Sequence, residues 1–596
     1  MLKLIKGDDY MSSTILNIID EVNSKYEILI NSKDEFEKKE ALEFILNHQY
    51  DDTYITNIVG TMYLDGIGVS IDSKKAFSYF RISYKKKNIK SSYYLGYCYY
   101  NGIGVKKDYN KSYYYLHKAY KEGCKEAAFL LGLTYYYGNG SMVSYNNALS
   151  CFLEAAKNGV KESYCYIGLA YYYGRGVAIN YHKARHWFDK DHNKDSLYYL
   201  GLLYINGYLN GKIDGDMAYK CFSLASGLEN KEAFVMVGDC YLYGYGVKSD
   251  VLRALEIYRE GYDELNVTLS YAKLGYAYIY CDNVNHDVKR GLNYLFKGAK
   301  LNDSTCYYYL GKYYSDNINI RPNIPMAQEY FIKGVKLYDA RCCYELALIE
   351  KELNHYDVYE GLITDAIKLG SIEAKLLIAN EFIKSNKSYT RNKGFTYFKD
   401  VAKTYNNEAL FNAGLCYMRG KGIKKNSKKA LKYLILASEN GNIDSYYYIG
   451  KLYDTNKIVK INHNKALEYY LKGSEEGNVY CSYMLGKRYV EGKILQKNTE
   501  KGLDLLEEAS NEIGIATFYL AKIYDEGKYV EKNIDKAIEY LNRGSNQKDP
   551  NAKFMLGFYY YNGTGVRKDK TKALTLFKEA RKLGNKDAEK MLGDIR

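Results

Sequence analysis

The chain repeats one helical pattern of small, aliphatic and aromatic positions along most of its length. Each copy can be aligned on a glycine or alanine, which we call the anchor. An aliphatic residue stands one position before the anchor, a small residue stands five before it in all copies but one, and tyrosine stands three after it in thirteen of fifteen copies. Because these positions are four residues apart, they form one stripe of an α-helix, which we call helix A. The anchors are Gly60, Gly96, Gly132, Gly168, Gly201, Gly238, Gly275, Gly311, Ala347, Ala379, Gly414, Gly450, Gly486, Ala521, Gly557 and Gly593.

A second pattern follows the tyrosine in most copies. In the first copy it reads Gly66-Ile67-Gly68-Val69, and the run that continues it contains Lys75-Ala76 and Phe80. The first glycine can end helix A in the left-handed conformation, and the second permits a tight turn. The run Lys-Ala-x-x-x-Phe/Tyr predicts a second amphipathic helix, helix B. Anchors recur every 32 to 37 residues, so the chain is one helix-turn-helix unit copied about fifteen times.

These features resemble the Sel-1-like repeat family, which is related to the tetratricopeptide repeats. The resemblance rests on Leu-Gly-x-x-Tyr-x-x-Gly-x-Gly-Val-x-x-Asp-x-x-Lys-Ala at a period of 36 residues, over residues 51 to 596. It implies an all-α fold, an α/α solenoid or superhelix of about fifteen repeats, with helix A of each unit lining a concave surface. It also implies roles as adaptors in signalling, protein degradation or host–microbe interaction.

The copies differ enough to predict five segments. Residues 1–50 lack the motif but contain two helical patterns, Ser12 to Ile30 and Asp34 to Asn47, and we expect them to cap the first repeat. Residues 51–275 form a regular arm. Residues 276–405 are degenerate repeats with Cys281 to Val284 and Asp316 to Ile318 in place of Gly-x-Gly, and we expect an irregular joint there. Residues 406–585 form a second regular arm, and residues 586–596 a capping helix.

Composition limits the location of the protein. The N-terminal apolar stretch is too short for a signal sequence, and no run of 18 apolar residues could cross a bilayer. We therefore expect a cytoplasmic protein without membrane insertion. Abundant lysine, asparagine, isoleucine and tyrosine suggest AT-rich coding, so part of the net charge of +14 reflects codon bias. The resemblance adds microbes of amoebae and giant viruses as sources, in which case the site of action is the host cytoplasm.

Several residue groups invite a chemical interpretation. Cys306, Cys342 and Cys481 occupy the small-residue position, and the paired cysteines of secreted relatives are absent, so we expect reduced structural thiols. His182 and His186, with Asp189 and His192 nearby, share one helical face and could bind zinc. No Cys-x-x-Cys or His-Glu-x-x-His pattern accompanies them, so exposed or capping roles are favoured. We expect no metal site and no cofactor.

Other motifs are incomplete. Gly-x-Gly follows a helix here and lacks the third glycine of a dinucleotide fingerprint, and Gly211-Lys212 and Gly420-Lys421 lack the Ser or Thr of a P-loop. Penicillin hydrolysis has been proposed for Cys-rich relatives, but Ser545-x-x-Lys548 has none of the partner motifs of that active site. Lysine clusters lie in turns among acids, so solvated loops are favoured over nucleic-acid binding.

The concave face is the expected binding surface. By analogy with tetratricopeptide repeats, its positions are one and four or five after the anchor and three or six before it. One after the anchor stand Lys451, Lys487 and Lys522, with Lys312 before this series, which predicts a basic track for acidic partners. In the first arm the same position holds an apolar strip of Tyr97, Leu133, Leu169 and Leu202. Chance placement of an abundant residue, or packing between repeats, would also account for these patterns.

The sequence therefore predicts a non-catalytic scaffold or adaptor that binds proteins or peptides along its groove. No set of acid, base and nucleophile recurs outside packing positions, which argues against an enzyme. The alternatives are a substrate-recruiting subunit of a ubiquitin ligase complex, which the family suggests, and a hydrolase of the Cys-rich repeat type. The partner, the pathway and the oligomeric state do not follow from the sequence.

Overall fold

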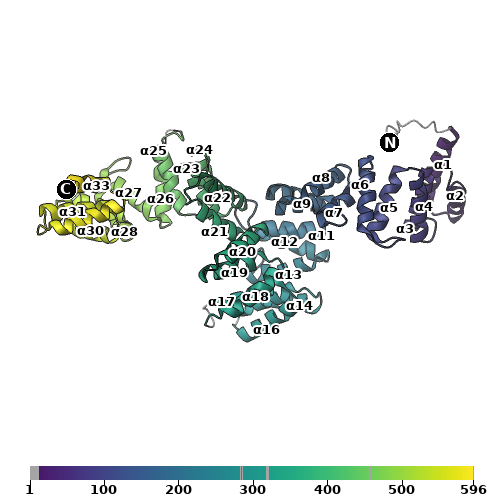
Figure 1. Cartoon of the computed structure of the whole chain (residues 1–596), viewed down its shortest axis with the longest axis horizontal. Coiled ribbons are helices and arrows are strands. Elements are labelled where there is room, and N and C mark those ends of the chain that lie inside the picture. Colours follow the sequence, from purple (N-terminus) through teal and green to yellow (C-terminus); the bar gives the residue numbers. More distant parts are fainter. Residues whose placement is uncertain (1–12, 282–283, 285, 317–320, 457, 595–596) are drawn as a thin grey trace. The chain divides into compact units, whose positions relative to one another are not determined.

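The protein is all-α, as predicted. A computed structural model describes residues 13–281, 284, 286–316, 321–456 and 458–594. These residues form 33 α-helices and one short 3₁₀ helix, η1 (Ala402–Thr404), and contain no strand (Figure 1). The helices alternate between helix A and helix B of successive repeats, which confirms the α/α solenoid fold. The predicted turns at 281–284 and 316–318 lie partly outside the described residues.

The chain divides into two compact units. The first comprises residues 1–209 and 213–310. Its helices are α1 (Ser13–Asn31), α2 (Glu35–Asn47), α3 (Thr53–Asp65), α4 (Ser73–Lys85), α5 (Ile89–Asn101), α6 (Tyr109–Lys121), α7 (Ala127–Tyr137), α8 (Tyr145–Lys157), α9 (Ser163–Tyr173), α10 (Tyr181–Asp191), α11 (Lys194–Ile205), α12 (Gly215–Gly227), α13 (Lys231–Tyr243), α14 (Val251–Asp263), α15 (Leu269–Tyr280), α16 (Val288–Lys300) and the first part of α17 (Ser304–Ser315).

The second unit comprises residues 210–212 and 311–596. After the rest of α17 its helices are α18 (Ile324–Lys336), α19 (Ala340–Glu352), α20 (Tyr356–Lys368), α21 (Ile372–Phe382), α22 (Ser388–Val401), α23 (Asn407–Arg419), α24 (Ser427–Glu439), α25 (Asp444–Thr455), α26 (His463–Glu475), α27 (Val479–Glu491), α28 (Thr499–Ser510), α29 (Gly514–Glu526), α30 (Ile534–Asn546), α31 (Pro550–Asn562), α32 (Lys570–Lys582) and α33 (Lys586–Asp594).

The anchor is glycine because a large side chain of helix B lies directly on it. A Cβ atom added to Gly60 would stand 2.5 Å from Cε1 of Phe80 and 2.8 Å from its Cδ1. Phe80 is fully buried, and its ring stacks on Tyr94 at 4.4 Å between centroids. The missing Cβ therefore lets helices A and B of one repeat approach closely. The same pairing recurs in Gly132/Phe152, Gly238/Tyr258, Gly450/Tyr470 and Gly557/Phe577.

The lysine of the Lys-Ala motif has a partner in the tyrosine of helix A. In the first repeat, Nζ of Lys75 lies 5.0 Å from the centroid of the Tyr63 ring, within the range of a cation–π interaction. Eight further repeats place Lys or Arg over the equivalent ring, at 4.1 to 5.7 Å; they are Lys111/Tyr99, Lys183/Tyr171, Arg290/Tyr278, Lys429/Tyr417, Lys465/Tyr453, Lys501/Tyr489, Lys536/Tyr524 and Lys572/Tyr560. These cations join the two helices in nine of the repeats.

Hydrogen bonds fix the turn between helices A and B. Gly102 ends α5 in the left-handed conformation at φ 77°. The backbone N–H of Asp108 then donates to the carbonyl of Tyr99 at 3.0 Å, and its side chain accepts from the backbone N–H of Lys111. The acid before helix B is therefore its N-cap. Gly104 has a further role, because a Cβ there would overlap the carbonyl oxygen of Ser73 in the preceding repeat.

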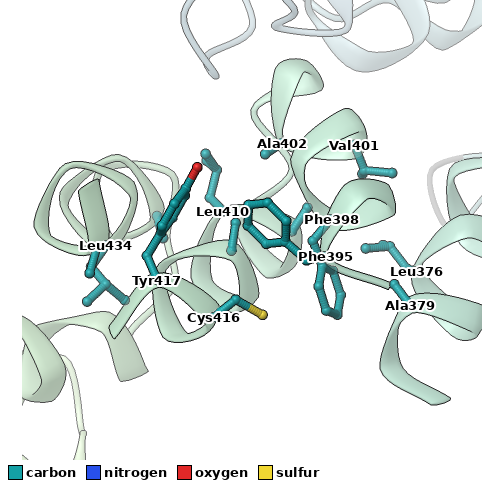
Figure 2. Packing of buried hydrophobic residues seen from close by; sticks show 14 of the residues in the cluster. Leu376, Ala379, Phe395, Phe398, Val401, Ala402, Leu410, Cys416, Tyr417 and Leu434 are labelled. Carbon is teal, nitrogen blue, oxygen red and sulfur yellow. The ribbon is translucent and has the colours of Figure 1, made fainter. Parts of the chain in front are cut away.

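Repeats without the glycine anchor still bury the anchor position in a hydrophobic core. Residues 340–406 contain the helices α19 to α22, and Ala347 and Ala379 are fully buried. Figure 2 shows Phe395 and Phe398 between Leu376 and Ala379 on one side and Leu410 and Tyr417 on the other, in a cluster that continues into α23 and α24. The ring of Phe395 meets that of Tyr417 edge-on, at 5.1 Å. An alanine anchor is thus compatible with a helical hairpin and with a buried position in its core.

The N-terminal helices share a core with the first repeat. Val22 and Leu29 of α1 and Ile45 of α2 are buried in one cluster with Ile55 and Met62 of α3. The pair α1 and α2 thus covers the apolar surface that α3 and α4 would otherwise expose. Among the described residues, no helix is both long and apolar enough to cross a membrane.

Candidate functional site

Most residues considered above for metal binding or catalysis are buried or in contact with other side chains of the protein. Eleven of the twelve cysteines are buried free thiols. Burial raises the pKa of Cys481 to about 12, which leaves its thiol protonated. Within the described part of the chain, no three His, Cys, Asp or Glu side chains are grouped to hold a metal ion. Asp189 instead pairs with Arg185 at 3.2 Å, and His186 lies edge-on to Trp187. Ser545 is buried, with Nζ of Lys553 at 3.4 Å from its Oγ.

The four lysines of the expected basic track lie on the A helices of the second unit, beside acids or aromatic rings. Lys312 pairs with Asp316 at 3.3 Å and with Glu345 at 3.6 Å. The remaining three also have contacts on their own or the next helix A: Lys451 with the Tyr447 ring at 5.6 Å, Lys487 with Glu491 at 3.8 Å and the Tyr519 ring at 5.3 Å, and Lys522 with Glu526 at 3.4 Å. Local acids thus offset much of the predicted positive charge.

The apolar strip of the first unit lies in part on a groove. A cavity of about 880 Å³ extends over the A helices α7, α9, α11 and α13. Leu133 and Leu169 of the predicted strip line it, together with residues at other positions of the same helices. Leu202 packs into the hydrophobic core beside it, and Tyr97 belongs to α5, with its ring 6.4 Å from that of Tyr93. The cavity brings together only two of the four predicted positions.

The groove walls are aromatic and its rim is acidic. Aromatic and apolar walls come from Phe129, Leu133, Tyr137, Cys165, Tyr166, Leu169, Tyr198 and Tyr199; the polar lining comes from Lys161, Glu162, Asp191, Asn193, Asp195, Asn230 and Glu232. Four carboxylates therefore face one lysine. Among the residues that the structure describes, no basic side chain forms an ion pair with any of these four carboxylates. The groove therefore combines part of the predicted apolar strip with acids, which lie close to the helix termini.

Three of the four acids of the groove occupy the same position in successive repeats. Glu162, Asp195 and Glu232 each stand six residues before an anchor, at the start of α9, α11 and α13. Acids are favoured there by the positive end of the helix dipole. Asp191 is the last residue of α10 and accepts a hydrogen bond from Ser196 Oγ at 2.8 Å. Asp195 accepts from Nδ2 of Asn230 at 3.0 Å, so neighbouring repeats fix these side chains.

Burial and mutual repulsion change the ionisation of the groove. The pKa of Asp191 is raised, first by desolvation and further by the charges of Glu162 and Asp195. Desolvation also raises the pKa of Tyr198 to about 12 and that of Tyr199 well above its usual value. The phenols therefore stay neutral at physiological pH and can donate hydrogen bonds.

The second unit has a smaller cavity of about 390 Å³ at the turns before α25 and α27. Its lining includes Asn442, Asp444, Asn478, Tyr480 and Glu512, and none of the expected lysines. Most of its lining comes from turn residues and the first residues of these two helices. The larger groove of the first unit is the stronger candidate for a binding site because it combines volume, aromatic walls and uncompensated charge.

Solved structures of low sequence identity resemble the chain in fold. One is c5321, a protective antigen present in uropathogenic Escherichia coli strains and displaying an SLR fold, at 22% identity and a TM-score of 0.37, over 81% of this chain and 97% of that one. Another is a Sel1 repeat protein from Oxalobacter formigenes, at 20% identity and a TM-score of 0.26, over 47% of this chain and 96% of that one. No curated protein matches the chain significantly.

The family model of the Sel1 repeat matches the chain thirteen times. The matched residues are 57–88, 89–124, 125–160, 161–190, 194–230, 232–264, 268–303, 304–339, 407–442, 443–478, 479–512, 514–549 and 550–585. They include every helix that lines the groove. Together they cover well over half of the chain, and the chain belongs to the Sel1 repeat family.

Proposed function

We propose that this protein is a non-catalytic scaffold that binds a segment of a partner protein in the groove over α7, α9, α11 and α13. Sel1 repeat proteins are generally scaffolds for protein interaction, which supports the class of function. The observation that carries the proposal for this chain is the 880 Å³ cavity over four successive A helices, three of which supply aromatic walls. Tyrosine is a favoured contact residue because it offers large apolar area and a hydroxyl at little entropic cost.

The cytoplasmic location is part of this proposal. Eleven buried free cysteines support it, since unpaired cysteines are typical of reducing compartments. An acidic partner at the lysines of the second unit also remains a proposal, but the acids beside Lys312, Lys487 and Lys522 weaken it.

The groove can be tested by crosslinking in cells. A photoreactive amino acid is placed at Leu169, which lines the cavity, and separately at Leu252, which is exposed on helix B α14. We expect a discrete crosslinked partner from position 169 and none from position 252. Equal crosslinking from both positions would contradict a role for the groove, and turnover of a substrate by the purified protein would contradict a non-catalytic scaffold.

A further inference from the structure

We infer that the groove of the first unit takes a basic segment of the partner, with a lysine or arginine side chain held between its tyrosine rings and its carboxylates. This inference rests on the proposed function and deepens it by naming the chemistry of the occupant. The acidic partners expected from the sequence belong to the lysines of the second unit, and for this groove the sequence predicted only an apolar strip.

The charge of the groove is opposite to that of the chain. The protein carries a net charge of +14, yet the groove is lined by Glu162, Asp191, Asp195 and Glu232 against Lys161 alone. Four neighbouring carboxylates without an ion-pair partner in the described structure therefore favour a cationic occupant, which would lower their mutual repulsion.

Helix capping accounts for only part of this arrangement. Glu162, Asp195 and Glu232 stand at helix N-termini, where the helix dipole favours a negative charge. Asp191 stands at the C-terminus of α10, where the dipole disfavours it. Its Oδ2 accepts from Asn193 and Ser196, and in the described part of the chain no donor is bonded to its Oδ1. An acid held in an unfavourable position beside three others points to a ligand that offsets its charge.

The preceding repeat shows how a basic group occupies such a position. Glu126 stands six residues before its anchor, as Glu162, Asp195 and Glu232 do. Its carboxylate is paired with Nζ of Lys90 at 3.3 Å, one repeat earlier. The next three repeats have the acid without that lysine. A basic side chain of a partner would reproduce the Lys90–Glu126 pair at Glu162 or Asp195.

The aromatic walls suit a cation as well as an apolar side chain. Tyr166 and Tyr199 line the cavity, and each ring is held by stacking on a buried phenylalanine of helix B, Phe152 at 5.0 Å and Phe188 at 5.6 Å. Lysine and arginine bind the faces of such rings, and this chain uses that contact throughout its repeats, as in Lys183 over Tyr171 at 5.2 Å. Arginine fits best because it can stack on a ring while donating two hydrogen bonds to a carboxylate.

The test selects random dodecapeptides displayed on phage against the full-length protein. We expect the selected peptides to be enriched in arginine and lysine, and their binding to fall about tenfold for each carboxylate neutralised, as in Glu162→Gln and Asp195→Asn, which is the size of one charge-assisted hydrogen bond. Glu264→Gln, at an exposed acid at the end of α14, is the matched control and should leave the selection unchanged.

Three outcomes would overturn the inference: no enrichment of basic residues, enrichment of acidic ones, or unchanged binding by the Glu162→Gln/Asp195→Asn variant. If the acids serve only the helix dipole, this double variant loses thermal stability while the selected peptides stay the same. The crosslink at position 169 keeps the two proposals apart. A crosslinked partner segment without lysine or arginine would refute the basic occupant and leave the scaffold function standing.

Discussion

Replacing Gly60 by alanine is expected to destabilise the first repeat, although alanine is the better helix former. The new Cβ would stand 2.5 Å from Cε1, 2.8 Å from Cδ1 and 3.1 Å from Cζ of Phe80. Contacts of carbon atoms are comfortable at about 3.5 to 4.0 Å, so the ring has to move by nearly 1 Å. Phe80 is fully buried and stacked on Tyr94, so it has no free space on its far side.

The change in stability caused by Gly60→Ala is the difference between two opposed effects. Overpacking a filled core costs about 1 to 3 kcal/mol, and a rigid ring against a second ring belongs at the upper end. Alanine in place of glycine inside a helix gains about 0.5 to 1 kcal/mol. We therefore expect a net loss of about 1 to 2 kcal/mol. At Gly361 in α20 an added Cβ meets no atom within 4 Å, so Gly361→Ala should stabilise its repeat by about 0.5 to 1 kcal/mol.

Hydrogen exchange of the full-length protein can measure both changes locally. Repeats of a solenoid open in a nearly independent way, so peptides from α3 and α4 report on Gly60 and peptides from α20 report on Gly361. The decisive variant combines Gly60→Ala with Phe80→Leu, since Ala521 and Leu541 already share one buried cluster of this chain. We expect Gly60→Ala to lower the stability of the repeat less when position 80 is leucine than when it is phenylalanine. Equal stabilisation by both single variants, or no coupling between positions 60 and 80, would refute this account of the anchor.

Three further predictions concern buried polar groups. Asp454→Ala should lower the free energy of unfolding in urea by about 3 to 5 kcal/mol, because it leaves the buried Arg488 guanidinium without its counter-ion. A decrease below about 1 kcal/mol would contradict this. Burial raises the pKa of Cys240 to about 12, so an alkylating reagent at neutral pH should modify it only after unfolding. Burial also raises the pKa of Tyr198 and Tyr483 to about 12, above the usual 10, so the folded state holds these two protons more tightly than the unfolded state does. The free energy of unfolding should therefore be constant with respect to these groups below pH 10 and should fall as the pH rises to 12. Urea unfolding at each pH measures this change.

The repeat, its two helices and its turn could be predicted because each depends on residues within one copy of the motif. The role of the motif lysine could not. Lys75 and Tyr63 are twelve residues apart on different helices, and only the closed hairpin brings them within 5.0 Å. The sequence shows that both residues recur. It does not show that they meet, because the angle between helices A and B decides which side chains face each other.

The net charge of a binding surface is also difficult to predict from the sequence. A lysine track was predicted from positions one after the anchor, but Lys487 and Lys522 each have an acid four residues later on the same helix, at 3.8 and 3.4 Å. That neutralisation is visible in the sequence once the helix is known.

The acidic groove is harder to predict, because its charge depends on partners one repeat away. Glu126 and Glu162 occupy equivalent positions, yet Lys90, 36 residues before Glu126, neutralises only the first of them. In a solenoid, residues separated by one period are direct neighbours. The charge presented by any position therefore has to be summed with the positions one period before and after it, and that sum marks the groove over α9, α11 and α13 as a site for a cation.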